Sequence, residues 1–222
     1  MSVSEKLKSL RAEIKQIAIE NARAFSDIHL VAVSKKQPDS RLEEALAAGQ
    51  RIFGENRVQE AYAHWEERKK LYSDLELHLI GPLQTNKVKE AVALFDVIQS
   101  VDREKLARKL AAEMDNQGKS LPCFIQVNTG EEEQKSGIYP AQLQDFYEFC
   151  TKECGLSITG LMCIPPLDDP PAAHFALLHK YARGLDLPHL SMGMSADYEQ
   201  AIALGATYIR IGTGVFGERQ TL

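Results

Sequence analysis

The sequence predicts a (β/α)8 barrel of the TIM type with an extra helix before its first strand. Eight short apolar segments alternate with helical stretches, and near-continuous apolar strands are typical of a parallel sheet buried on both faces. The last strand is expected to end near Gly212, which leaves too few residues for an eighth helix, so the opening helix must cover that gap. The length of 222 residues also fits the lower end of barrel sizes, roughly 200 residues. We expect residues 1–222 to form a single domain.

The opening helix is predicted over residues 4–24, because Leu7, Leu10, Ile14, Ile17 and Ala18 recur at spacings of three and four. The predicted strands are residues 28–35, 51–54, 75–81, 97–101, 122–128, 158–163, 189–192 and 208–212. An open doubly wound sheet is the alternative architecture. The missing eighth helix and the lack of room for an appended domain favour the barrel.

Residues typical of helix starts stand between the strands. Capping-box patterns pair Ser40 with Glu43 and Asn56 with Gln59. The other expected starts are at Thr85 or Asn86, Asp102, Pro140, Asp169 before Pro170, and Ser195.

Composition excludes several classes of protein. The chain has 31 acidic and 26 basic residues, a net charge of -5 and no basic cluster, so we expect no nucleic-acid partner. The longest apolar run, residues 91–95, is far short of the about 20 residues of a membrane span. The first residues lack the apolar core and cleavage site of a secretory signal. We expect a cytoplasmic protein without a membrane partner, either a monomer or a weak homodimer.

Cysteine and histidine spacing argues against a metal site. The four cysteines contain no CxxC pair, and in a reducing compartment we expect free thiols. Cys150 and Cys154 have helical spacing, but no histidine is close to them in sequence. His174 and His179 are five residues apart, which places them off one helical face, and no HExxH occurs. We expect no metal.

A phosphate-binding site is predicted after strands seven and eight, where such barrels commonly hold phosphate. These strands end in SMGMS (191–195) and RIGTG (210–214). Their glycines let backbone amides approach an anion, and Ser191, Ser195 and Thr213 add hydroxyls. Residues 212–217 also match GxGxxG, but a dinucleotide site needs a following βαβ unit, for which the chain has no room. A simple turn that closes the barrel is the plainer interpretation of these glycines.

A lysine at the end of the first strand is the candidate reactive group. Neighbouring side chains on a strand point to opposite faces, and Lys35 shares its face with Val31 and Val33, so Lys35 and not Lys36 is expected to point into the barrel. An inward lysine beside a phosphate site suits attack on an aldehyde to form a Schiff base, which requires the neutral amine. Nearby cations, Lys36 and Arg210, would favour deprotonation.

Plainer structural interpretations stand beside these functional ones. In the plainer interpretation, Lys35 only extends its ammonium to solvent at a strand end. Asn56 and Ser195 would then serve only as helix caps, and Lys135, in a loop, would be solvated.

Eight segments together resemble the pyridoxal phosphate homeostasis protein family, which is related in fold to the amino-terminal barrel of alanine racemase. The resemblance spans nearly the whole chain after residue 28. The segments are VAVSK (31–35), FGENRVQE (53–60), HLIGPLQTNKVK (78–89), IQSVD (98–102), IQVNTGEEEQKSG (125–137), GLMCIP (160–165), LSMGMSADYEQAI (190–202) and RIGTGVFGER (210–219).

The resemblance implies that Lys35 carries pyridoxal 5'-phosphate (PLP) as a Schiff base and that Arg210 faces the pyridine nitrogen. It also implies that Asn56 lines the cofactor and that Ser191 and the residues after strand eight hold the phosphate. Ser195 is added for its hydroxyl at the expected phosphate site. The expected cofactor-binding residues are Lys35, Asn56, Ser191, Ser195, Arg210, Gly212 and Thr213.

Four positions depart from the family pattern. Arg57 stands where an aromatic residue is usual, Pro82 where many members have histidine, Thr85 where serine is common, and Lys36 where threonine is usual. Pro82 lies in a loop that the resemblance places near the cofactor.

The function implied is a non-catalytic one: the protein would sequester PLP and deliver it to PLP-dependent apoenzymes. Racemisation needs an acid and a base on opposite faces of the substrate carbon, and in the related racemase one of them comes from a second domain, which we expect to be absent here. A small PLP-dependent amino-acid racemase is the alternative. A barrel enzyme that acts on a phosphorylated sugar through a lysine is a third hypothesis, based on fold alone.

Overall fold

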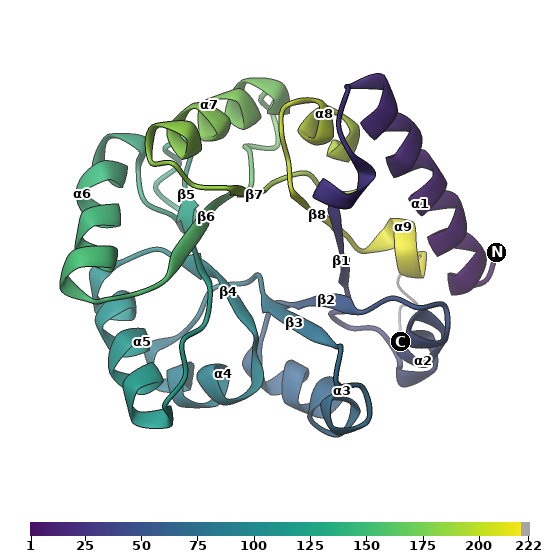
Figure 1. Ribbon diagram of the computed structural model, residues 1–222, viewed down its shortest axis with the longest axis horizontal. Coiled ribbons are helices and arrows are strands. Elements are labelled where there is room, and N and C mark those ends of the chain that lie inside the picture. Colours follow the sequence, from purple (N-terminus) through teal and green to yellow (C-terminus); the bar gives the residue numbers. More distant parts are fainter. Residues whose placement is uncertain (219–222) are drawn as a thin grey trace.

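A computed structural model describes residues 1–218, which contain a closed barrel of parallel strands (Figure 1). Neighbouring strands pair in chain order, and β8 returns to pair with β1. The predicted (β/α)8 fold is therefore confirmed. The strands are β1 His29–Val33, β2 Ile52–Glu55, β3 Glu76–Leu79, β4 Val97–Val101, β5 Cys123–Val127, β6 Ile158–Cys163, β7 His189–Ser191 and β8 Tyr208–Ile211.

The α-helices form a ring outside the sheet (Figure 1). They are α1 Val3–Glu20, α2 Asp39–Ala47, α3 Val58–Leu71, α4 Val88–Leu94, α5 Glu104–Gln117, α6 Leu143–Glu148, α7 Pro171–Gly184, α8 Tyr198–Ala203 and α9 Thr213–Phe216. Short 3-10 turns are η1 Phe25–Asp27, η2 Thr85–Lys87 and η3 Pro140–Gln142, and a π-helical segment, η4 Phe149–Glu153, extends α6.

The opening helix α1 closes the ring as expected. Its first turn is held by a capping box, in which Ser2 accepts from the amide of Glu5 and the Glu5 carboxylate accepts from the amide of Ser2. One face of the helix is buried, and this face packs between α2 and α8 (Figure 1). One expectation was wrong: β8 is followed by the one-turn helix α9, which packs against α1.

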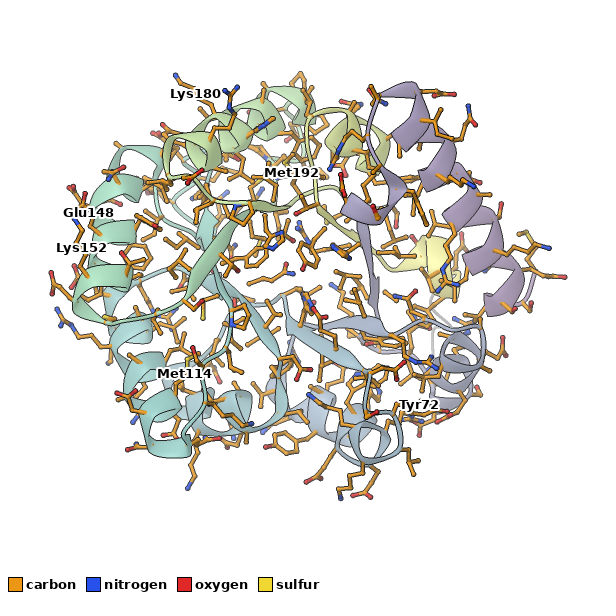
Figure 2. The ribbon with its side chains drawn as sticks, viewed as in Figure 1. Tyr72, Met114, Glu148, Lys152, Lys180 and Met192 are labelled. Atoms are coloured by element: carbon orange, nitrogen blue, oxygen red, sulfur yellow. The ribbon has the colours of Figure 1, made fainter. Side chains whose placement is uncertain are left out.

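The core has two parts, separated by the sheet. A large apolar shell joins the outer faces of the strands to the helices, whereas a small cluster of Val97, Phe124 and Met162 with Tyr208 forms a separate group. Figure 2 shows side chains filling the centre of the barrel, with Lys152 and Lys180 on the outer rim pointing away from it. The barrel is therefore a packed body whose ligand must bind at a mouth.

Most of the expected helix caps are wrong. Helices α2, α3, α5, α7 and α8 have Pro38, Arg57, Arg103, Pro170 and Asp197 at the cap position, and none of these side chains makes a capping hydrogen bond. Ser40, Asn56, Asp102 and Ser195 are therefore not caps. The path of each loop across the barrel rim decides where its helix begins. The starts at Thr85 and Pro140 are confirmed as the 3-10 turns η2 and η3.

The four cysteines are free thiols. Burial raises the pKa of Cys123, Cys150 and Cys163 to about 12, so these thiols are protonated and unreactive at neutral pH. Among residues 1–218, no helix is long and apolar enough to cross a membrane.

Candidate functional site

The carboxyl ends of four neighbouring strands bring most of the predicted site residues to one mouth of the barrel. Lys35 follows β1, Asn56 follows β2, Ser195 follows β7 and Thr213 follows β8. These strands are adjacent in the order β7, β8, β1, β2, because β8 pairs with both β7 and β1. Residues that are far apart in sequence therefore lie around one arc of the rim.

The two lysines that follow β1 differ in burial. Ser34 points outward, because its hydroxyl donates to Oε1 of Glu55 at 2.6 Å, and the same oxygen accepts from the indole of Trp65 on α3. The next residue, Lys35, is half-buried, while Lys36 is exposed and has a φ of 57°. Strand β1 itself ends at Val33, so both lysines lie in the turn that follows it. Lys35 is the more buried lysine of this turn.

Asn56 is held at the rim by close backbone packing. A Cβ atom on Gly81, after β3, would lie 2.4 Å from the carbonyl oxygen of Asn56, so only glycine fits there. The loops after β2 and β3 are therefore in direct contact, and this contact fixes the half-buried Asn56 between them.

Two hydroxyls meet where the loops after β7 and β8 converge. Thr213 donates to the hydroxyl of Ser195 at 3.1 Å, and both residues are exposed. Gly193 makes the sharp turn after β7: its φ is +90°, and a Cβ there would lie 2.5 Å from the Cβ of Ala201. Thr213 also begins α9 after Gly212, where the first amides have no acceptor within the helix. Hydroxyls and backbone amides together make this corner suitable for an anion.

Ser191 lies apart from this pair, below the rim. It is fully buried, donates its hydroxyl to Oε1 of Gln99 at 2.5 Å and accepts from Nη1 of Arg210 at 2.7 Å. Its single hydroxyl hydrogen is thus used inside the barrel and is not available to an anion at the mouth. This geometry favours Ser195 over Ser191 as the hydroxyl donor of the rim.

Arg210 points into the barrel and is only 4% exposed. Its Nη2 donates to the carbonyl oxygen of Cys163 at 2.8 Å, so both acceptors that hold the Nη atoms, this carbonyl and the Ser191 hydroxyl, are neutral. Burial lowers the pKa of Arg210, yet a guanidinium keeps its charge at neutral pH. The side chain is therefore a fixed cationic donor beneath the mouth.

Two buried polar residues were missed by the sequence reasoning. Gln99 on β4 and His78 on β3 are fully buried and hydrogen-bonded to each other. The available signal was a lone amide inside the apolar strand VIQSV, because a buried polar group is costly unless it is hydrogen-bonded.

Of the departures from the family pattern, Pro82 and Arg57 are exposed, and Arg57 directly precedes α3. Lys135 is not simply solvated, as the plainer interpretation held. Its ammonium lies 2.5 Å from a carboxylate oxygen of Glu132 and 3.4 Å from the carbonyl oxygen of Pro165. Lys135 therefore links the loops after β5 and β6.

A second cluster lies on the outer side of the sheet. Ligand atoms of Glu55, Glu60 and His64 are within 4.8 Å of one another, and Nδ1 of His64 lies 2.8 Å from Oε1 of the buried Glu55. This hydrogen bond raises the pKa of His64 against the opposite effect of burial. The close spacing is thus explained by an ion pair between α3 and β2.

The class of protein to which this barrel belongs is given by a family comparison. The model of the family "Alanine racemase, N-terminal domain" matches residues 7–220. Among solved structures, alanine racemase of Clostridium difficile has a TM-score of 0.70 at 12% identity, covering 94% of this chain and 57% of that one. At this identity the likeness concerns the fold alone.

Curated relatives narrow the class. The pyridoxal phosphate homeostasis protein of Vibrio cholerae is 40% identical, covering 98% of this chain and 97% of the relative, and that of Escherichia coli is 38% identical with the same coverage. PipY of Synechococcus elongatus, solved with PLP bound, has a TM-score of 0.85 at 39% identity and covers 97% of this chain and 100% of that one. This chain belongs to the pyridoxal phosphate homeostasis protein family, as its motifs predict.

Proposed function

We propose that this protein binds PLP at the carboxyl-terminal mouth of its barrel and serves in intracellular PLP homeostasis. The observation that carries the proposal is the position of Lys35 next to the corner formed by Ser195 and Thr213. Strands β1 and β8 are paired, and a Cβ on Gly212 would lie 3.6 Å from the carbonyl oxygen of Val33. The turn that carries Lys35 and the corner formed by Ser195 and Thr213 are therefore neighbours on the rim. The solved PLP complex of PipY supports the choice of ligand.

The donor set at the mouth fits the cofactor. The amine of Lys35 matches the aldehyde of PLP. The hydroxyls of Ser195 and Thr213, with the amides at the start of α9, match its phosphate, and Arg210 is a fixed cationic donor for its ring nitrogen. Lys35 would bind the aldehyde as a Schiff base, Ser195, Thr213 and the amides after Gly212 would hold the phosphate, and Asn56 would line the ring.

Arg210 argues for binding without turnover. Bound PLP supplies an electron sink, which is strongest when an acidic partner keeps its pyridine nitrogen protonated. A guanidinium has donors but no acceptor, so Arg210 facing that nitrogen would oppose its protonation. We therefore propose a carrier that supplies PLP-dependent apoenzymes and does not itself convert amino acids.

The test uses the purified protein loaded with PLP. Borohydride reduction followed by mass spectrometry should place one adduct on Lys35, and incubation with a PLP-dependent apoenzyme should transfer the cofactor and restore that enzyme's activity. A panel of amino acids is followed in parallel for racemisation and decarboxylation. Turnover well above that of free PLP would replace this proposal by the racemase alternative.

A further inference from the structure

A continuous chain of hydrogen bonds crosses the inside of the barrel from Arg210 to the opposite mouth. Arg210 donates to Ser191 at 2.7 Å, and Ser191 donates to Oε1 of Gln99 at 2.5 Å. The Nε2 of Gln99 lies 2.6 Å from Nδ1 of His78, and Nε2 of His78 lies 2.5 Å from Oε1 of Glu76. The chain therefore links β8, β7, β4 and β3.

With a neutral imidazole between them, the two ends of this chain determine the direction of every hydrogen bond in it. Arg210 can only donate and the carboxylate of Glu76 can only accept. Ser191 must then pass its one hydrogen to Gln99, whose amide nitrogen donates to His78. The imidazole consequently keeps its hydrogen on Nε2 for Glu76. For a neutral imidazole, reversing the amide of Gln99 would place the hydrogen on Nδ1 and leave an unprotonated Nε2 of His78 facing the carboxylate, so the reversed arrangement is disfavoured.

This chain of hydrogen bonds from Arg210 to Glu76, called the relay below, lies mostly in the buried interior of the barrel. Ser191, Gln99 and His78 are fully buried, and Arg210 is 4% exposed. A buried charge is costly unless it is paired or hydrogen-bonded. Glu76 is the carboxylate at the end of the relay, and its side chain is 39% exposed at the amino-terminal mouth.

The carboxylate end of the relay is ionised under neutral conditions. The hydrogen bond with His78, followed by the nearby His29 and His189, lowers the pKa of Glu76 against the effect of burial. An anion at one mouth is thus connected to a cation beneath the other through the hydrogen bonds of Ser191, Gln99 and His78. Aligned hydrogen bonds of this kind polarise and strengthen one another.

We propose that Gln99 and His78 are positioning residues that orient Arg210 toward the cofactor and pair its charge with Glu76 through the relay. The protein thereby balances a buried arginine without placing a carboxylate next to the cofactor ring. The effect on PLP rests on the function proposed above, whereas the relay is a property of the protein alone and is tested separately.

The first experiment needs no cofactor. Nitrogen-15 NMR of labelled histidine should show His78 neutral with its hydrogen on Nε2. In Gln99→Glu the new carboxylate accepts from both neighbours, so the imidazole should carry a hydrogen on Nδ1, either as the other tautomer or as a cation. Wild-type His78 with its hydrogen on Nδ1 would overturn the relay, and so would an unchanged His78 in a folded Gln99→Glu protein.

The second experiment measures PLP affinity and the absorption spectrum of the bound cofactor in Gln99→Met and Glu76→Gln. Gln99→Met breaks the relay with a side chain of similar length, and affinity should fall about tenfold, which is near the lower end of the contribution of one hydrogen bond to a charged group. Glu76→Gln keeps the acceptor but removes the charge, so a smaller loss with a shifted spectrum is expected. Melting temperatures are recorded to confirm that each variant is folded.

Asp74→Asn is the matched control, because Asp74 lines the same mouth but pairs with Arg51 outside the relay. It should bind PLP like the wild type. If both relay variants match this control, their positioning role is wrong. If the wild type itself takes up no PLP, the proposed function fails, and the NMR result still decides whether the relay exists.

Discussion

The two faces of the barrel sheet are built on different chemistry. The outer face packs apolar side chains such as Phe53 and Leu77 against helices, and this packing is non-directional. The inner face combines a small apolar cluster with the buried polar residues Arg210, Gln99 and His78. These inner residues depend on hydrogen bonds of fixed length and direction.

This difference separates stability from function within one sheet. Loss of an apolar side chain on the outer face should lower the free energy of unfolding, because buried apolar area is lost. It should leave the mouth unchanged, because apolar contacts do not orient the polar groups on the other face. Loss of an inner or rim residue should alter ligand binding more than folding. Four variants, one of them a double substitution, test this separation.

The largest effect is expected at Lys35, on the rim. Lys35→Ala should abolish the borohydride-reducible PLP adduct, because it removes the amine that would bind the aldehyde. The matched control is Lys36→Ala, which removes the exposed neighbour and should retain the adduct. Mass spectrometry of the reduced proteins measures both. An adduct on Lys36 in the wild type would contradict the assignment.

A large loss of stability is expected from the outer face. Phe175 on α7 is fully buried in the apolar shell, and Phe175→Ala should lower the free energy of unfolding by about 3–5 kcal/mol through lost burial and the cavity left behind. Urea denaturation measures this. The folded variant should still bind PLP as the wild type does, and a parallel loss of affinity would show that the two faces are coupled.

An intermediate effect is expected at the anion corner. Ser195→Ala combined with Thr213→Val should weaken PLP binding by about 1.5–3 kcal/mol for each hydrogen bond lost to a charged group. Pyridoxal without its phosphate should bind the variant and the wild type alike. Titration followed by absorption distinguishes the two ligands. Equal weakening of both would place the phosphate elsewhere.

The smallest effect concerns the ion pair of His64 with Glu55, a polar contact on the outer face. The hydrogen bond to Glu55, together with Glu60 and Asp39, raises the pKa of His64. The stabilisation is therefore complete below the usual histidine value of about 6.5 and is lost as the pH rises through the raised pKa. The stability difference between the wild type and His64→Gln should shrink with rising pH, with a slope of at most about 1.4 kcal/mol per pH unit.

Urea denaturation of both proteins between about pH 6 and pH 9 measures this difference. A difference that is constant over this range would show that His64 does not change its charge there.

The sequence by itself determined the fold class, the order of elements and the family. The alternation of apolar strands with helices is a local pattern that can be seen in the sequence. Because both faces of the sheet are buried, each strand is an almost uninterrupted run of apolar residues. The expected separation of Lys35 from Lys36 by strand alternation does not apply, because β1 ends at Val33 and both lysines lie in the turn that follows it. Helix starts were less predictable: Ser40 and Ser195 have capping chemistry, but the loops reach their helices at Pro38 and Asp197.

Only the tertiary structure decided how the polar groups are used. Ser191 and Ser195 are equivalent hydroxyls in SMGMS, yet one is fully buried against Arg210 and the other is exposed beside Thr213. Gln99 belongs to the relay because the closed barrel brings β4 to face β7 across its centre. A hydrogen bond requires two groups within about 3 Å at a suitable angle, and for residues 92 positions apart barrel closure alone establishes that distance.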